Sequence, residues 1–385
     1  MNPGPTQAAP TQANPAQPGA ARPPLAAHPA LRTRFCELVG IEHPVVQTGM
    51  GWVAGPRLAA ATSEAGGLGI IAGGTMTLEQ LTAAVHEMKD RTGKPFGVNL
   101  RADAPDAQDR ARLLIAEGVR VASFALAPDR RLIGLLADAG VVTMPSIGAR
   151  RHAEKVAAWG VDAVLVQGGE GGGHTGAVPT SLLLPQVLDA VDIPVVAAGG
   201  FFDGRGLVAA LAYGASAVAM GTRFLLTRDA PVSQAVKDVY LATPVTGTVV
   251  TTQVDGVPHR VLRTALVDRL ERDRGPVRLA RALRNAVIFQ RESGTPWAQV
   301  AREGLSMRRT HELSWSQVVM AANTPVLLKA AMVDGRPDLG VMSTGQVVGV
   351  IDDLPTVAEL VARIVAEAGD VLDRLGSPRP AGLPA

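Results

Sequence analysis

One glycine-rich segment combines residue types that could bind a flat ligand and move a proton. Six of the ten residues from Gln167 to Gly176 are glycine, in the order Gln-Gly-Gly-Glu-Gly-Gly-Gly-His-Thr-Gly. Each glycine loses extra backbone entropy on folding, so this run indicates that the backbone closely approaches another group. Gln167 has a donor and an acceptor, which suits the edge of a heterocycle, and His174 can exchange a proton near neutral pH.

We therefore predict that His174 is a catalytic or substrate-orienting residue. The alternative is that His174 only bonds to the surrounding glycine-rich turn. Glu170 has two equally good interpretations, because its carboxylate could act as a second base or could tie the loop down.

A second set of glycines is typical of phosphate binding. Gly199 and Gly200 follow the apolar run 193–198, and Gly221-Thr222-Arg223 follows the run 215–220. Glycine lets an anion approach backbone N–H groups, and a helix N-terminus adds a favourable dipole. The alternative is that these glycines only make tight turns, but the occurrence of two such loops favours a phosphate site.

Several other chemistries are poorly supported. The single cysteine, Cys36, excludes an intramolecular disulfide and a multi-cysteine metal site. We predict no metal site, because His174 has no second histidine or cysteine nearby in the sequence. A Gly-x-Ser-x-Gly elbow between a strand and a helix is absent, and Gly49-Met50-Gly51 lacks the third glycine of a dinucleotide motif.

The elements that must position these residues alternate between short apolar runs and segments with helical periodicity. The expected strands are 44–47, 68–72, 96–100, 119–124, 141–147, 161–167, 193–198 and 215–220, and the clearest expected helices are 77–91, 106–117 and 149–159. The strands are apolar at consecutive positions, which is typical of a parallel sheet buried on both faces. Eight such units predict an α/β fold of the (β/α)8 TIM-barrel type, with an open doubly wound sheet as the alternative.

Length and composition are consistent with one large barrel and an appended region. The 385 residues are 47% hydrophobic, which is enough for a sizeable core, and the net charge of +2 gives no sign of nucleic-acid binding. We expect a Pro/Ala-rich tail at 1–30, a barrel at 31–243, a smaller, mainly helical substrate region at 244–335, a return segment at 336–376 and a second tail at 377–385. No signal peptide or membrane span is evident, so we expect a cytoplasmic protein that does not bind membranes.

The near-neutral total hides one basic segment. Residues 260–309 contain twelve arginines and five acidic residues, a local excess of seven positive charges. Arginine pairs well with phosphate oxygens, so this segment could bind a phosphate-bearing substrate such as a CoA thioester. A solvated helical face or a contact between subunits is the alternative, and no individual arginine can be singled out.

Five segments together resemble the nitronate monooxygenase (2-nitropropane dioxygenase) family. They are Gln47-Thr48-Gly49-Met50, Phe96-Gly97-Val98-Asn99, Gln167 to His174, Ala198-Gly199-Gly200 and Met220-Gly221-Thr222-Arg223. Members of this family are FMN-binding (β/α)8 barrels related to flavin-dependent enoyl-acyl-carrier-protein reductases. The resemblance covers roughly residues 33–350 and implies FMN as the cofactor.

The resemblance also implies a role for individual positions. Asn99 and Gln167 would hold the isoalloxazine, and His174 matches the family base in nitronate oxidation. The residues implied to bind the cofactor are Gln47, Thr48, Gly49, Met50, Asn99, Gln167, Gly172, Gly200, Ala219, Met220, Gly221 and Thr222. The first four would lie along the ring, and those from Gly172 onward would hold the ribityl phosphate. Gly171 departs from the family, in which alanine is common at this position.

Further stretches resemble one subgroup, the flavin-dependent enoyl-CoA dehydrogenases of actinobacterial steroid ring C/D breakdown. These stretches are 46–55, 121–128, 259–264, 313–317 and 320–325. The subgroup implies oxidation or reduction of the α,β-bond of a CoA thioester, with NADH as a further candidate partner. The alternatives are a nitronate monooxygenase and a non-catalytic flavin-binding module. A homodimer is a plausible assembly.

Overall fold

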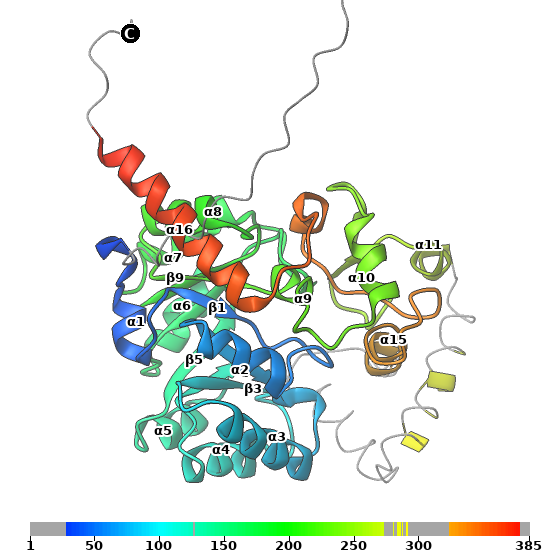
Figure 1. Cartoon of the computed structure of the whole chain (residues 1–385). Coiled ribbons are helices and arrows are strands. Elements are labelled where there is room, and N and C mark those ends of the chain that lie inside the picture. The colour runs from blue at the N-terminus through cyan, green and yellow to red at the C-terminus, as the bar shows by residue number, and fades with distance from the viewer. Residues whose placement is uncertain are drawn as a thin grey trace, which may run out of the picture.

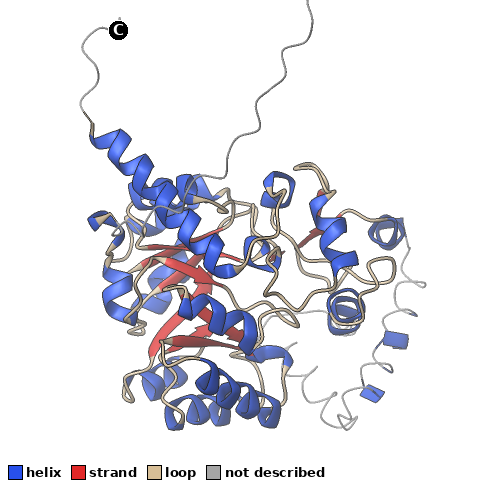
Figure 2. Cartoon of the chain, in the orientation of Figure 1, coloured by secondary structure: helices blue, strands red, loops and turns tan. Residues whose placement is uncertain are grey.

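Eight parallel strands close into a barrel in the computed structural model, in the order β1-β2-β3-β4-β5-β6-β8-β9 (Figures 1 and 2). The structure describes residues 28–125, 128–272, a few isolated residues between 280 and 291, and 323–377. The barrel strands are β1 (Val45–Gln47), β2 (Leu68–Ala72), β3 (Phe96–Leu100), β4 (Val121–Phe124), β5 (Val142–Ile147), β6 (Val164–Gln167), β8 (Val195–Ala198) and β9 (Ala217–Met220). The predicted TIM barrel and all eight predicted strands are therefore confirmed.

The strands form because both of their faces are buried. In β1, Val46 belongs to the cluster inside the barrel with Ile70 and Met144, whereas Val45 packs outward against the helices. The interior cluster continues to Phe35, which lies on α1 (Arg34–Val39) and helps to close the barrel at the N-terminal ends of the strands. Two-sided burial explains the consecutive apolar residues.

Helices cover the outside of the barrel (Figure 2). They are α2 (Pro56–Glu64), α3 (Leu78–Arg91), α4 (Ala107–Ala116), α5 (Arg130–Ala137), α6 (Arg150–Ala157), α7 (Thr180–Leu188), α8 (Gly204–Tyr213), the short α9 (Thr222–Leu225) and the C-terminal α16 (Val357–Gly376). The predicted helices 77–91, 106–117 and 149–159 are confirmed as α3, α4 and α6. Thr77 and Thr356 begin α3 and α16 with capping boxes, as their sequences favour.

The described residues between the barrel and α16 lie at one side of the molecule and include α10 (Gln234–Leu241), α11 (Ala265–Arg272) and α15 (Asn323–Met332) (Figure 1). They also include two strands that the sequence analysis did not predict, β10 (Thr248–Thr251) and β11 (His259–Leu262). β11 pairs with β10 on one side and, on the other, with β7 (Gly173–His174), which is part of the glycine-rich loop after β6. The added sheet therefore connects this region to the loop that contains His174.

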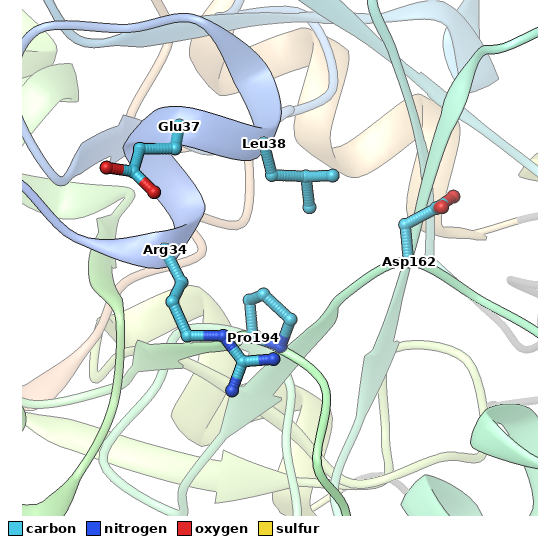
Figure 3. A pocket seen from close by; sticks show the side chains of 5 residues that line it. All are labelled: Arg34, Glu37, Leu38, Asp162 and Pro194. Carbon is cyan, nitrogen blue, oxygen red and sulfur yellow. The ribbon is translucent and has the colours of Figure 1, made fainter.

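The opposite end of the barrel has a surface hollow lined by Arg34, Glu37, Leu38, Asp162 and Pro194 (Figure 3). Asp162 and Pro194 precede β6 and β8, so the hollow lies at the N-terminal ends of the strands. Asp162 is engaged there as an acceptor for the backbone N–H and the hydroxyl of Thr143. Barrel enzymes place their chemistry at the other end.

Two further predictions concern the ends of the chain and membranes. The expected tails lie outside the described residues except at 28–30 and 377, and the short 3-10 helix η1 (Pro29–Leu31) begins within the first. Among the described helices, none combines the length and the apolar character that crossing a membrane requires.

Candidate active site

The predicted phosphate loops meet a segment that is distant in the sequence. A Cβ added to Gly172 would lie only 2.4 Å from the carbonyl carbon of Thr344. The next residue, Gly345, donates its backbone N–H to Thr222 Oγ1 at 2.9 Å, at the N-terminus of α9. Gly172 and Thr222 are therefore brought together, and Thr344-Gly345, just before the 3-10 helix η3 (Gln346–Val350), lies between them.

Gly199 and Gly200 form an unusual turn beside this cluster. Their φ angles are +93° and +89°, in the left-handed region that glycine adopts without steric cost. A Cβ added to Gly200 would meet only the Cβ of Glu170 within 4 Å. A side chain at Gly200 would therefore collide with nothing, and the positive φ is what strains any residue other than glycine there.

The ends of β1, β3 and β9 also converge. Gly49 packs so tightly on Asn99 that an added Cβ would lie 2.5 Å from the Asn99 Cβ. A Cβ added to Gly221 would lie 3.3 Å from Thr48 Oγ1 and 3.5 Å from the sulfur of Met50. The structure therefore brings residues of these three strand ends, which the family resemblance assigns to the cofactor, to one edge of the barrel.

Three of the predicted cofactor positions lie deeper. Ala219 and Met220 are buried in β9, and the side chain of Gln47 is fully buried and donates from Nε2 to the Ile70 carbonyl at 3.2 Å. Gln47 Oε1 has no hydrogen-bond partner. The side chain of Gln47 thus braces the barrel, and its backbone leads directly into Thr48, whose N–H donates to the Met220 carbonyl.

The glycine-rich loop folds back onto its first residue. Gln167 Nε2 donates to the carbonyls of Gly172 at 3.2 Å and His174 at 2.9 Å. A Cβ at Gly171 would lie 2.7 Å from Gln167 Nε2. Glycine at this position, where the family commonly has alanine, therefore leaves room for the Gln167 amide. Gln167 therefore fixes the loop from within.

Glu170 had two interpretations, a second base or a residue that ties the loop down. Its carboxylate accepts from the backbone N–H of Thr180 at 2.9 Å and from the hydroxyl of Thr180 at 2.7 Å, at the start of α7. Its backbone carbonyl accepts from the N–H of Gln346 at 3.0 Å. Glu170 ties the loop to α7, as one of the two interpretations predicted.

His174 forms a hydrogen bond with Asp255, which lies between β10 and β11. Nε2 of His174 is 2.7 Å from Asp255 Oδ2, and the hydroxyl of Thr324, on α15, donates to the same oxygen at 2.8 Å. The side chain of Asp255 is 6% exposed and that of His174 is 59% exposed. Burial raises the pKa of Asp255, but hydrogen bonds and charge interactions with His174 and His259 lower it by more, to well below its usual range.

His259 is the second histidine of this cluster. Its ring centroid lies 4.7 Å from that of His174, its Nδ1 is 3.6 Å from Asp255 Oδ2, and its Nε2 is 2.7 Å from Ser343 Oγ. Burial lowers the pKa of His259, which favours the neutral imidazole. No second histidine is near His174 in the sequence, but antiparallel pairing of β7 with β11 places His259 opposite His174 in space.

His174, Asp255 and His259 also have atoms of metal-ligating type within 4.8 Å of one another. The short contacts are those of a hydrogen-bonded cluster, since Asp255 Oδ2 already has His174 Nε2 and the Thr324 hydroxyl as partners. The prediction of no metal site stays a prediction.

Arg260, from the basic segment, contacts the glycine-rich loop. The guanidinium of Arg260 donates to the Gly169 carbonyl at 2.8 and 3.2 Å and to Thr248 Oγ1 at 2.9 Å. Arg263 instead pairs with Asp268 at an exposed position. Arg260 holds the glycine-rich loop, whereas Arg274, Arg278, Arg281, Arg302, Arg308 and Arg309 lie outside the described residues.

Sequence reasoning missed Asp255, Thr324, Ser343 and the Thr344-Gly345 segment as site residues. One signal for Asp255 was available, because Asp255-Gly256 lies between two β-branched runs and Asp-Gly is a frequent hairpin signal. Gly256 indeed has a φ of +85°. The other residues carry no local pattern that points to the barrel.

Comparisons with known proteins agree with this geometry. The family model described as nitronate monooxygenase matches residues 32–367. A Mycobacterium tuberculosis protein named (3aS,4S,5R,7aS)-5-hydroxy-7a-methyl-1-oxo-octahydro-1H-indene-4-carboxyl-CoA dehydrogenase is 64% identical over 341 residues, 88% of this chain and 96% of that protein. A Rhodococcus jostii protein of the same name is 60% identical over 349 residues, 91% of this chain and 99% of that protein.

A solved structure extends the comparison to the fold. FabK from Thermotoga maritima superposes with a TM-score of 0.73 at 35% sequence identity, over 89% of this chain and 98% of its own. The chain is thus similar to these proteins over most of its length, and it has a closed parallel barrel, a glycine-lined edge and a histidine on the loop after β6. The chain is an oxidoreductase that belongs to the nitronate monooxygenase family.

Proposed function

We propose that this protein is an FMN-dependent dehydrogenase that oxidises the α,β-bond of a CoA thioester derived from steroid rings. The carrying observation is its identity of 60–64%, over most of the chain, to two proteins named as an indene-carboxyl-CoA dehydrogenase. The site adds a half-exposed histidine that is hydrogen-bonded to a buried carboxylate and lies on the same loop as Gly172.

The residues fit a flavin mononucleotide. The cradle of Gly172, Gly200 and Thr222 offers backbone and a hydroxyl to the phosphate, and a Cβ added to Gly200 would have only the Glu170 Cβ within 4 Å. Asn99 and Gln167 carry the amide groups that can bond to the edge of a flavin ring. When bound, the flavin supplies the chemistry of accepting a hydride.

The part played by the chain itself is proton transfer and orientation. Asp255 is ionised and accepts from His174 Nε2, so Nδ1 of His174 is the atom that takes the α-proton of the thioester. The β-hydrogen leaves with its electron pair as the double bond forms. Oxidation removes one proton and one hydride, and the enoyl-CoA is the product.

The test is anaerobic reduction of the purified yellow protein. We expect the saturated indene-carboxyl-CoA to bleach the flavin absorbance, the corresponding free acid to leave it unchanged, and the cofactor released by heat to comigrate with FMN rather than FAD in chromatography. Bleaching by an alkyl nitronate but not by the thioester would overturn the proposal. A protein that cannot be loaded with any flavin would overturn it as well.

Nitronate oxidation is the second candidate function, favoured by the family model that matches the chain. His174 would then take the α-proton of a nitroalkane, and oxygen would be the oxidant. Oxygen uptake with a nitronate, measured beside the thioester assay, separates the two activities. A protein that binds FMN but turns over neither substrate would be the non-catalytic binding module of the sequence analysis.

A further inference from the structure

We propose that Asp255 is a positioning residue that, together with Thr324, fixes His174 in the tautomer that can accept a proton at Nδ1. The inference rests on the proposed function only in taking His174 as the base. Asp255 comes from the region beside the barrel, 81 residues after His174 in the sequence.

The carboxylate is held on both oxygens. Oδ2 is 2.7 Å from His174 Nε2 and 2.8 Å from the hydroxyl of Thr324, and Oδ1 accepts from the backbone N–H of Val257 at 3.2 Å. With 6% of its side chain exposed, Asp255 has little access to water and depends on these partners. Two fixed oxygens leave the carboxylate little freedom to rotate away from the histidine.

An ionised carboxylate only accepts hydrogen bonds. The proton on the neutral His174 ring must therefore reside on Nε2, and the lone pair on Nδ1. The same logic applies to catalytic histidines whose orienting carboxylate selects the tautomer. Since 59% of the His174 side chain is exposed, the ring remains accessible to a ligand.

His259 restricts the ring from the side. Its centroid lies 4.7 Å from the His174 centroid at an interplanar angle of 55°, and its backbone pairs with that of His174. Ser343 Oγ holds His259 Nε2 at 2.7 Å. Tyr240 in turn donates its hydroxyl to the Ser343 carbonyl at 2.7 Å, so the wall beside His174 is anchored to α10.

The first experiment compares Asp255→Asn with Asp268→Asn, the same change at an exposed pair with Arg263. For Asp255→Asn we expect kcat to fall about 100-fold, KM to change less than about 3-fold, and the isotope effect with α-deuterated substrate to rise. We expect Asp268→Asn to behave like the parent protein. A fall in kcat with an unchanged isotope effect and proportional loss of bound flavin would indicate a merely structural role and overturn the proposal.

A double variant tests whether the two residues act as one unit. In the His174→Gln background, Asp255→Asn should lower the residual rate by less than about 2-fold, because its partner is already missing. A second loss as large as the first would overturn the assignment. Thr324→Val, which keeps the carboxylate, should lower kcat about 5-fold with the same rise in isotope effect. This variant covers the case in which Asp255→Asn does not fold.

A readout without substrate separates this inference from the proposed function. In 15N-histidine-labelled protein, NMR should show His174 as the Nε2–H tautomer, with its signals assigned through the His174→Gln variant, and Asp255→Asn should shift the population toward the other tautomer. A parent protein with a proton on Nδ1 and none on Nε2 would overturn the positioning role whatever the substrate. Absence of thioester turnover with the expected tautomer would instead reject the proposed function alone.

Discussion

The proposed cofactor cradle and the His174 cluster share the loop after β6, which contributes Gly172 to the first and His174 to the second, but they are built in different ways. The proposed cradle uses backbone, because a side chain would collide with Thr344 and Gly345 at Gly172 and would be strained by the positive φ at Gly200. The His174 cluster uses side chains, with His174 bonded to Asp255 and Asp255 bonded to Thr324. Backbone requirements leave glycines in the sequence, whereas a side-chain network leaves no local signature.

The largest expected effect comes from a change in the His174 cluster. His174→Gln should lower kcat about 1000-fold, because general base catalysis is lost, while the flavin content and visible spectrum stay those of the parent. Stopped-flow measurement of flavin reduction by the thioester checks this. If reduction proceeds at the parent rate, His174 is not the base.

A change in the proposed cradle should weaken cofactor binding. Gly172→Ala would place its Cβ 2.4 Å from the Thr344 carbonyl carbon and 2.6 Å from the Gly345 nitrogen. We expect a loss of about 1–3 kcal/mol in stability and weaker FMN binding, measured by thermal unfolding and flavin titration.

The control for this change is Gly134→Ala in α5, where an added Cβ meets nothing within 4 Å. Alanine is the better helix former, so this variant should unfold at the same or a slightly higher temperature. Equal FMN affinity in Gly172→Ala and the parent would remove Gly172 from the cradle.

A change at Arg260 tests how the loop that carries both Gly172 and His174 is held in place. Arg260→Met removes donors to the Gly169 carbonyl and to Thr248, so we expect about 2 kcal/mol of destabilisation and roughly 10-fold lower kcat/KM. Arg263→Met, at an exposed ion pair, should cost less than about 1 kcal/mol. Thermal melts and steady-state kinetics on both variants give the comparison, and indistinguishable results would show that Arg260 does not hold the loop.

The smallest expected effect is at Gly171, where the neighbour of an added Cβ is a flexible side chain. Gly171→Ala should displace the Gln167 amide from the carbonyls of Gly172 and His174 and shift the flavin absorption spectrum. We expect kcat to change less than about 10-fold, because Gln167 can adopt another rotamer. An unchanged spectrum would separate Gln167 from the flavin ring.

Much of the fold could be predicted from the sequence because its signals are local. Consecutive apolar residues in runs such as 68–72 and 193–198 predicted two-sided burial, and the structure places β2 and β8 of the closed barrel in these runs. Glu170 shows the limit, because its two interpretations differed only in whether Thr180, ten residues later, would offer donors to its carboxylate.

The sequence by itself determined the eight-stranded barrel, the glycine loops at the strand ends and His174 as the candidate base. Tertiary structure alone decided which residues surround that base. Pairing of β7 with β11 brings His259 beside His174, and the turn that ends before β11 carries Asp255 to its Nε2. The physical reason is that a close approach or a positive φ of the backbone requires glycine at that very position, so the requirement is visible in the sequence. A hydrogen bond between residues 81 positions apart depends instead on how two separate segments pack.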